Sequence, residues 1–242
     1  MAELNLIENV LEEIDTLKRS SAKTALLYQV LQEHSSAIPL SAMVVFMYTI
    51  LDSGNKFEEQ EVINFLEDLI RICYTYDLSQ DIKYKVFDIN ARIMNKRPLS
   101  LSTINISDDF FEERRRYRNG FVMLYHYLVE DKWKDSEIGS FLKVERIVRQ
   151  NDFSAHSDWP ADTIGQDIEN MANFSIIDFP KSYKSLFERS ILYNSSTLNS
   201  VSSILRGKTY YSYTDFNNRK NNMQTVLSKF LIQPECEKDN NI

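Results

Sequence analysis

The chain has 242 residues, 43% of them hydrophobic and 26% charged, with a formal net charge of −7; this is the balance of an ordinary globular protein. Residues 1–107 carry a net charge of −5 and the remainder −2, so bulk charge argues against DNA binding but leaves room for a local basic patch. The two cysteines, Cys73 and Cys236, have no CxxC partner, which excludes a cysteine zinc site and a disulfide framework.

The first part of the chain, residues 1–98, is expected to form an all-helical domain. Five glycines and five prolines are few for this length, and low contents of both favour helices over sheets and loops. Apolar residues recur at helical spacing in the stretches 4–19, 22–33, 40–52, 57–76 and 79–95. Pro98 ends this part.

Two features predict a cytoplasmic protein without a membrane partner. The N-terminus carries Glu3, Glu8, Glu12 and Glu13, whereas a signal peptide begins with basic residues and an apolar run. The longest apolar run, residues 42–51, is too short to span a bilayer.

The second part, residues 108–232, changes character after a predicted helix over 108–130. The β-branched run "FLKVERIV" (141–148) and "NFSIID" (173–178) predict two short strands. Further helices are predicted over 180–192, 197–206 and 214–232, and a disordered polar tail over 233–242. The predicted fold class is therefore mainly α, a helical N-terminal bundle followed by a helical region with a small β-hairpin.

Basic residues gather in "EERRRYR", residues 112–118. A solvated helix face with ion pairs between neighbouring turns is one interpretation of this pattern. The other is a phosphate-contacting patch formed by Arg114, Arg115 and Arg118. Both remain open because neighbouring acids offset the positive charge.

Three histidines offer candidates for chemistry. His126 lies in an apolar helical run and is expected in the core, whereas His34 lies at a polar helix end and is expected at the surface. His156 lies in the polar segment "NDFSAHSDWPAD" with three aspartates, Asp152 among them. Such side chains can ligate a divalent metal, but their spacing fits no established ligand pattern. A flexible acidic loop is the competing interpretation, and no metal site is predicted.

Three short motifs occur in order along residues 108–232: "VERIVRQ" (144–150), "ANFSIID" (172–178) and "TDFNNRKNNMQTVLSKFL" (214–231). Together they resemble the C-terminal His-Asn-His nuclease region of GmrSD-type restriction proteins, bacterial type IV enzymes of phage defence. The matching positions are Glu145, Ile147, Gln150, Asn173, Thr214 and Arg219. The resemblance implies a ββα-finger-like hairpin, here in degenerate form.

This family uses a histidine as general base to activate water, with one divalent metal ion at the leaving oxygen. Arg146 stands in the position of that histidine, and an arginine side chain stays protonated at any working pH. His156, ten residues further along, and Asp152 are the candidates for catalysis if the protein is active, and Mg²⁺ or Mn²⁺ would then be required. We do not expect catalysis.

The predicted function is that of a non-catalytic or weakly active relative of these nucleases, which contacts DNA or a nucleotide-hydrolysing or nuclease partner protein. The predicted nucleic-acid-binding residues are Arg114, Arg115, Arg118, Arg146, Arg149 and Arg219. The alternative is an α-helical protein–protein interaction module with no nucleic-acid role. In that case the charged strand is an edge strand protected against aggregation.

Overall fold

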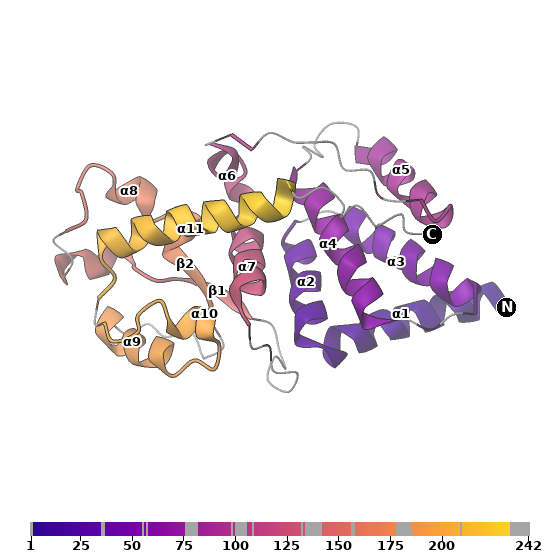
Figure 1. Cartoon of the computed structure of the whole chain (residues 1–242), viewed down its shortest axis with the longest axis horizontal. Helices are drawn as coiled ribbons and strands as arrows, with labels where there is room; N and C mark the ends of the chain where they lie inside the picture. Colours follow the sequence, from indigo (N-terminus) through magenta and orange to yellow (C-terminus); the bar gives the residue numbers. More distant parts are fainter. Residues whose placement is uncertain are drawn as a thin grey trace, which may run out of the picture. The chain divides into compact units, whose positions relative to one another are not determined.

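The structure is a computed structural model that describes residues 2–34, 37–54, 56, 58–75, 82–97, 99, 106–107, 109–131, 133, 142–155, 158–177, 185–208 and 210–232. Its described part is mainly helical with one two-stranded antiparallel sheet (Figure 1), which confirms the predicted fold class. Contacts divide the chain into unit 1, Met1–Ile106 with Lys229–Ile242, and unit 2, Ser107–Ser228. The predicted tail, 233–242, lies outside the described residues.

Unit 1 is built from the helices α1 (Ala2–Ser20), α2 (Ala22–Glu33), α3 (Ala37–Asp52), α4 (Glu59–Thr75) and α5 (Ile82–Met94). Helix α1 packs on α2 and α3, α2 packs on α4, and α3 packs on α5. The apolar stripes of α2 and α4 face this core, where Leu26, Leu66 and Leu69 are fully buried. Across the part of the chain that is described, no helix is both long and apolar enough to cross a membrane.

His34 corrects one expectation from the sequence. Its side chain is 2% exposed and its ring lies 5.5 Å from that of Tyr74, so the prediction of a surface histidine was wrong. The Tyr74 hydroxyl donates to the Val30 carbonyl at 2.6 Å. The end of α2 is therefore drawn into the core by its contact with α4, which the local polar sequence does not indicate.

Unit 2 contains the sheet and the remaining helices, although the last helix runs on past Ser228, where unit 2 ends. Its elements are α6 (Phe110–Glu113), η1 (Arg115–Tyr117), α7 (Arg118–Val129), β1 (Lys143–Arg146), η2 (Gln150–Ala155), α8 (Ile164–Asp167), η3 (Met171–Asn173), β2 (Phe174–Ile177), α9 (Leu186–Asn194), α10 (Asn199–Ser202) and α11 (Tyr213–Ile232). The single helix predicted over 108–130 is interrupted at Arg114, where a 3₁₀ turn begins with the Tyr117 amide donating to the Arg114 carbonyl at 2.9 Å.

The two strands pair with Glu145 opposite Ser175 and Arg146 opposite Phe174. Because side chains alternate along a strand, Glu145 and Ser175 share one face of the hairpin, and Arg146 and Phe174 the other. All four residues of β2 are buried and the strand packs against α7. Strand β2 is thus covered, whereas β1 is exposed at Lys143 and half-buried along the rest of its length.

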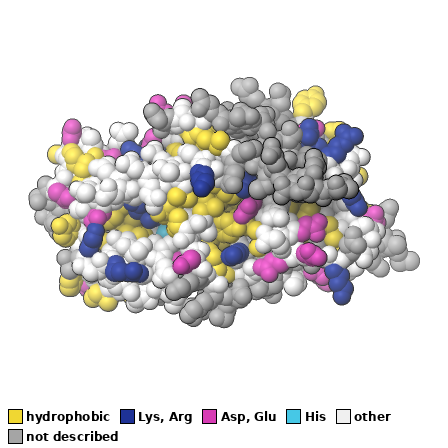
Figure 2. Space-filling model, viewed as in Figure 1, with side chains coloured by type: hydrophobic (Ala, Val, Ile, Leu, Met, Phe, Trp, Pro, Cys, Tyr) yellow, Lys and Arg dark blue, Asp and Glu magenta, His cyan; other side chains and the backbone are white. Residues whose placement is uncertain are grey.

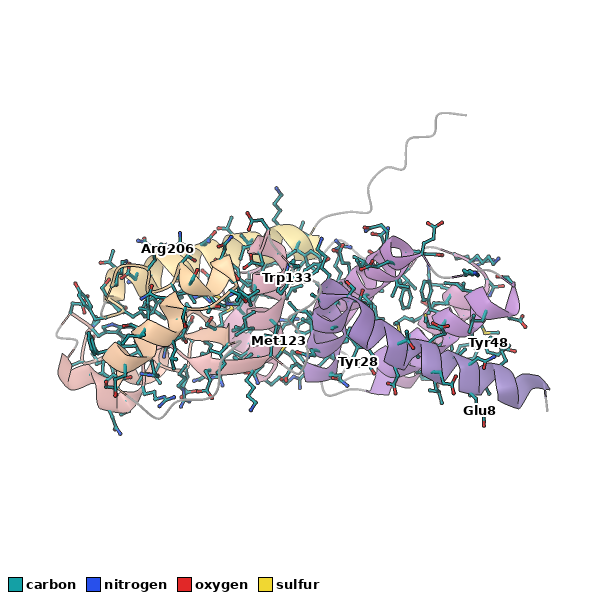
Figure 3. The ribbon with its side chains drawn as sticks, turned by 90° about the horizontal axis from the view of Figure 1, so that it is seen from below. Glu8, Tyr28, Tyr48, Met123, Trp133 and Arg206 are labelled. Carbon is teal, nitrogen blue, oxygen red and sulfur yellow. The ribbon has the colours of Figure 1, made fainter. Side chains whose placement is uncertain are left out.

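Helix α11 crosses α7 and β2 in Figure 1, and side-chain contacts connect the three elements. Met123 on α7, labelled in Figure 3, is 4% exposed within this packing. An aromatic group surrounds Trp159, whose indole Nε1 donates to the Tyr211 carbonyl at 3.1 Å and whose ring lies 4.9 Å from that of Phe216. The start of α11 is anchored to the loop before α8 in this way.

Candidate functional site

Three arginines from three elements converge on the side chain of Glu169. Arg118, the first residue of α7, donates from Nη1 to Glu169 Oε2 at 2.8 Å and to the Glu169 carbonyl at 3.1 Å. Arg146 at the end of β1 donates from Nη2 to Glu169 Oε1. Arg115 of η1 lies 3.8 Å from Oε2. We call these four residues the Glu169 arginine cluster.

The cluster carries more positive than negative charge, because three guanidinium groups meet one carboxylate. The side chains of Arg115 and Arg146 are 46% and 41% exposed, and that of Glu169 is 30% exposed. Ion pairs at this exposure contribute only about 0–1 kcal/mol to stability. Arg118 and Arg146 also lie over the Phe174 ring, at 3.9 and 5.5 Å from its centroid. The geometry therefore keeps the guanidinium groups together without neutralising them.

A pocket of about 10 Å³ lies beside the cluster, and its lining includes Phe111, Glu112, Arg115, Arg118, Phe121 and Glu169. This volume has room for about one water molecule. A nucleotide base or sugar does not fit into it. The chemistry available here is therefore contact with an anion at the surface.

The other arginines predicted to bind nucleic acid lie apart from this cluster. Arg149 pairs with Glu145 at 3.5 Å, and Glu145 faces the side of the hairpin away from Arg146. Arg114 lies over the Phe110 ring at 4.0 Å and 3.6 Å from Glu113. The six predicted arginines thus do not form one continuous surface.

The sixth, Arg219 on α11, contacts a buried histidine. Arg219 Nη2 donates to the Phe174 carbonyl at 3.0 Å and lies 3.2 Å from His126 Nε2. A guanidinium group cannot accept a hydrogen bond, so Nε2 is the unprotonated nitrogen. His126 Nδ1 then carries the proton and donates to Ser200 Oγ at 2.9 Å. His126 is fully buried, which confirms its predicted place in the core.

Burial, and secondly the charge of Arg219, hold the pKa of His126 well below its ordinary value. The unfolded chain therefore binds the proton more readily than the folded one, and the free energy of unfolding should fall as pH drops below about 6.5. We expect a loss of up to about 1.4 kcal/mol per pH unit from this group. Chemical denaturation between pH 7 and 5 measures it; His126→Gln should show a shallower decline, and equal slopes would contradict the assignment.

Of the two residues that the sequence suggests for catalysis, the structure describes Asp152 but not His156. The carboxylate of Asp152 accepts from Arg189 Nη2 at 2.5 Å and from the Arg149 amide at 2.8 Å. Arg189 is 3% exposed, and burial lowers its pKa despite the opposing effect of Asp152. Asp152 is therefore engaged in a buried ion pair between η2 and α9. His156 lies outside the described residues.

The motif residue Asn173 joins the two ends of the hairpin through its side chain. Its Oδ1 accepts from the Val148 amide at 2.9 Å, and its Nδ2 donates to the carbonyls of Val148 and Ile168 at 2.8 and 3.0 Å. The residue is fully buried. It holds the backbone after β1 and the turn before β2 together and is not available to a ligand.

Within the described ranges, no group of three or more His, Cys, Asp or Glu side chains could hold a metal ion. Asp158, one of the aspartates near His156, accepts from the Tyr213 amide at 2.9 Å. Mg²⁺ or Mn²⁺ would be needed only by an active enzyme, and the described residues offer no cage for either.

Sequence reasoning missed Glu169 and Arg189. Glu169 lies in "DIENMANF" and Arg189 on an amphipathic helix, where nothing in the local pattern marks either as more than a surface charge. Their partners are 23 to 54 residues away in the sequence for Glu169 and 37 for Arg189. Only tertiary contact reveals them.

Comparisons with protein-family models, curated proteins and solved structures found no match, so the resemblance to GmrSD-type nucleases stays a prediction. On the face drawn in Figure 2, basic and acidic side chains of the described residues are interspersed. A bulk basic surface is thus not available on that face, and any anion recognition depends on local groupings such as the Glu169 arginine cluster.

Proposed function

We propose that unit 2 is a non-catalytic relative of GmrSD-type defence nucleases that contacts the phosphate backbone of DNA through the Glu169 arginine cluster. The observation that supports this is the convergence of Arg115, Arg118 and Arg146 on a single carboxylate. Guanidinium groups recognise phosphate oxygens by paired hydrogen bonds. Backbone contacts of this kind position a protein on DNA without reading its sequence.

The absence of catalysis in this proposal follows from side-chain chemistry. Arg146 stands where the nuclease family has its general base and cannot accept a proton. Asp152 is held by Arg189 and by the Arg149 amide, which leaves its carboxylate poorly placed to take up a metal ion. Incubation with plasmid DNA and Mg²⁺ or Mn²⁺ should give no cleavage. Cleavage that His156→Ala abolishes would overturn this part of the proposal.

Charge reversal of the two most exposed cluster arginines should weaken DNA binding. In Arg115→Glu/Arg146→Glu we expect affinity for a labelled duplex to fall about tenfold or more at about 50 mM salt, with a similar loss for unrelated sequences. Fluorescence anisotropy measures the affinity. The slope of log affinity against log salt should become shallower by the contribution of about one to two phosphate contacts.

Arg206→Glu is the matched control for this experiment. Arg206 lies in the same unit, is exposed, donates to Ser202 Oγ at 3.2 Å and is labelled in Figure 3. This single reversal changes the charge as much as Arg146→Glu alone, and it should alter the affinity little, whereas Arg146→Glu alone should lower it. If both variants lose affinity equally, the loss reflects the net charge of the protein and not the Glu169 arginine cluster. If the wild-type protein does not bind the duplex in low salt, the proposal is refuted.

An exposed apolar stripe favours the second candidate, a protein–protein interaction module. Tyr84, Phe87 and Met94 on α5 are 78%, 75% and 66% exposed. Their spacing puts them on one side of the helix, and exposed apolar groupings of this kind are typical of interaction surfaces. If the wild-type protein does not bind DNA at low salt, this candidate becomes the better one.

A further inference from the structure

We infer that Glu169 occupies the position of a DNA phosphate, so that the cluster is a phosphate-binding site closed by the protein's own carboxylate. The inference rests on the proposed function and adds the ligand group and the residue that it displaces. The ligand is a phosphodiester whose non-bridging oxygens replace the Glu169 carboxylate oxygens between the arginines.

The contacts of Glu169 resemble those of a bound anion. One carboxylate oxygen, Oε1, accepts from Arg146, while the other, Oε2, accepts from Arg118 and lies near Arg115. A phosphodiester also presents two charged oxygens on one atom, and arginines bind carboxylate and phosphate groups by the same planar donor geometry. An anion that carries the same pair of oxygens can therefore take the place of this carboxylate.

Two of the three arginines are held in place by contacts other than Glu169's carboxylate. Arg118 and Arg146 lie over the Phe174 ring, whose residue is itself 5% exposed in the core. Arg118 also donates to the Glu169 backbone carbonyl. These contacts keep the guanidinium groups close together when the carboxylate moves, and they make the site preorganised for an anion.

Displacement of the carboxylate is sterically and energetically accessible. Glu169 follows α8 in a turn, and its side chain is 30% exposed. A rotation about its side-chain bonds takes it into solvent without disturbing the backbone. Ion pairs this exposed are weak and screened by salt. The backbone contact with Arg118 remains in place during this movement.

The test is Glu169→Gln, which removes the charge and keeps the shape. We expect its affinity for a labelled DNA duplex at low salt to rise roughly fivefold over wild type, since an exposed internal competitor is lost. In Glu169→Gln/Arg146→Gln the gain should disappear. Thermal unfolding checks that each variant is folded.

Glu113→Gln is the matched control. Glu113 is 66% exposed beside Arg114. The substitution changes the net charge of the protein by the same amount as Glu169→Gln. A gain confined to Glu169→Gln, over a wild-type protein that binds the duplex, supports the inference. Binding by this variant alone counts against the inference together with the proposed function. Equal gains in both variants overturn the inference but leave the proposed function standing. If neither wild type nor Glu169→Gln binds the duplex, both the inference and the proposed function fail.

Inorganic phosphate serves as a competitor in a second experiment. If a lower phosphate concentration displaces the duplex from Glu169→Gln than from Glu113→Gln, the result supports a phosphate site. If phosphate competes equally with both variants, the result counts against it.

Discussion

Replacing Asn173 by alanine should lower the free energy of unfolding by about 3–5 kcal/mol, because it leaves several buried backbone groups without partners at a cost of about 1–3 kcal/mol each. The groups are the amide and carbonyl of Val148 and the carbonyl of Ile168. Bulk solvent does not reach these groups in the folded protein, since Asn173 is fully buried. Urea denaturation followed by circular dichroism measures the change.

Asn173→Asp sharpens this prediction. The aspartate keeps the oxygen that accepts from the Val148 amide but loses both donated hydrogen bonds and brings a charge into the core, so it should be at least as destabilising as alanine. Asn194 serves as the control, because it is exposed and its Nδ2 donates to the Ser190 carbonyl at 2.8 Å. A loss below about 0.5 kcal/mol is expected for Asn194→Ala. If Asn173→Ala is equally mild, the residue does not hold the hairpin.

Replacing Asp152 by alanine should also be strongly destabilising, by about 3–5 kcal/mol, since it leaves the Arg189 guanidinium charged and buried. The two side chains are 11% and 3% exposed, so solvent screens the pair little. The Arg149 amide loses its acceptor as well. Thermal and urea unfolding of the variant should both show the loss, whereas a metal-binding or catalytic carboxylate at the surface would be neutral to stability.

A double substitution separates the ion pair from packing. Asp152→Leu/Arg189→Met removes both charges and keeps much of the apolar volume, and we expect it to be more stable than Asp152→Ala alone. If the double variant is the less stable of the two, then the charge left on Arg189 is not the cause of the loss, and packing or the hydrogen bond to Arg149 dominates.

The secondary structure was largely predictable. Helices such as α2 and α4 have apolar residues at a spacing of three and four, and this pattern needs no knowledge of the partner helix. The strands were recognisable from β-branched residues in "VERIV" and "FSII". Predicted boundaries were less accurate, as in the interruption at Arg114, because short 3₁₀ turns depend on neighbouring packing.

The candidate site was predictable only in part. Arg115, Arg118 and Arg146 stood out as basic residues, but the sequence did not indicate that they meet, nor that Arg149 lies elsewhere. Their meeting point, Glu169, is 51 residues from Arg118 and 23 from Arg146. Strand alternation explains the separation of Arg149, since its partner Glu145 faces away from Arg146.

By itself, the sequence determined that the chain is mainly helical, that a short hairpin interrupts the helices, and that the position of the expected general base holds Arg146. Tertiary structure alone decided the roles of the charged and polar side chains: Asn173 bonds the hairpin's backbone, Asp152 neutralises Arg189, and Glu169 gathers the arginines. The physical reason is the range of the interactions. Apolar periodicity is local along the chain, whereas the partner of a polar group is set by which distant segments the fold brings within a few ångströms.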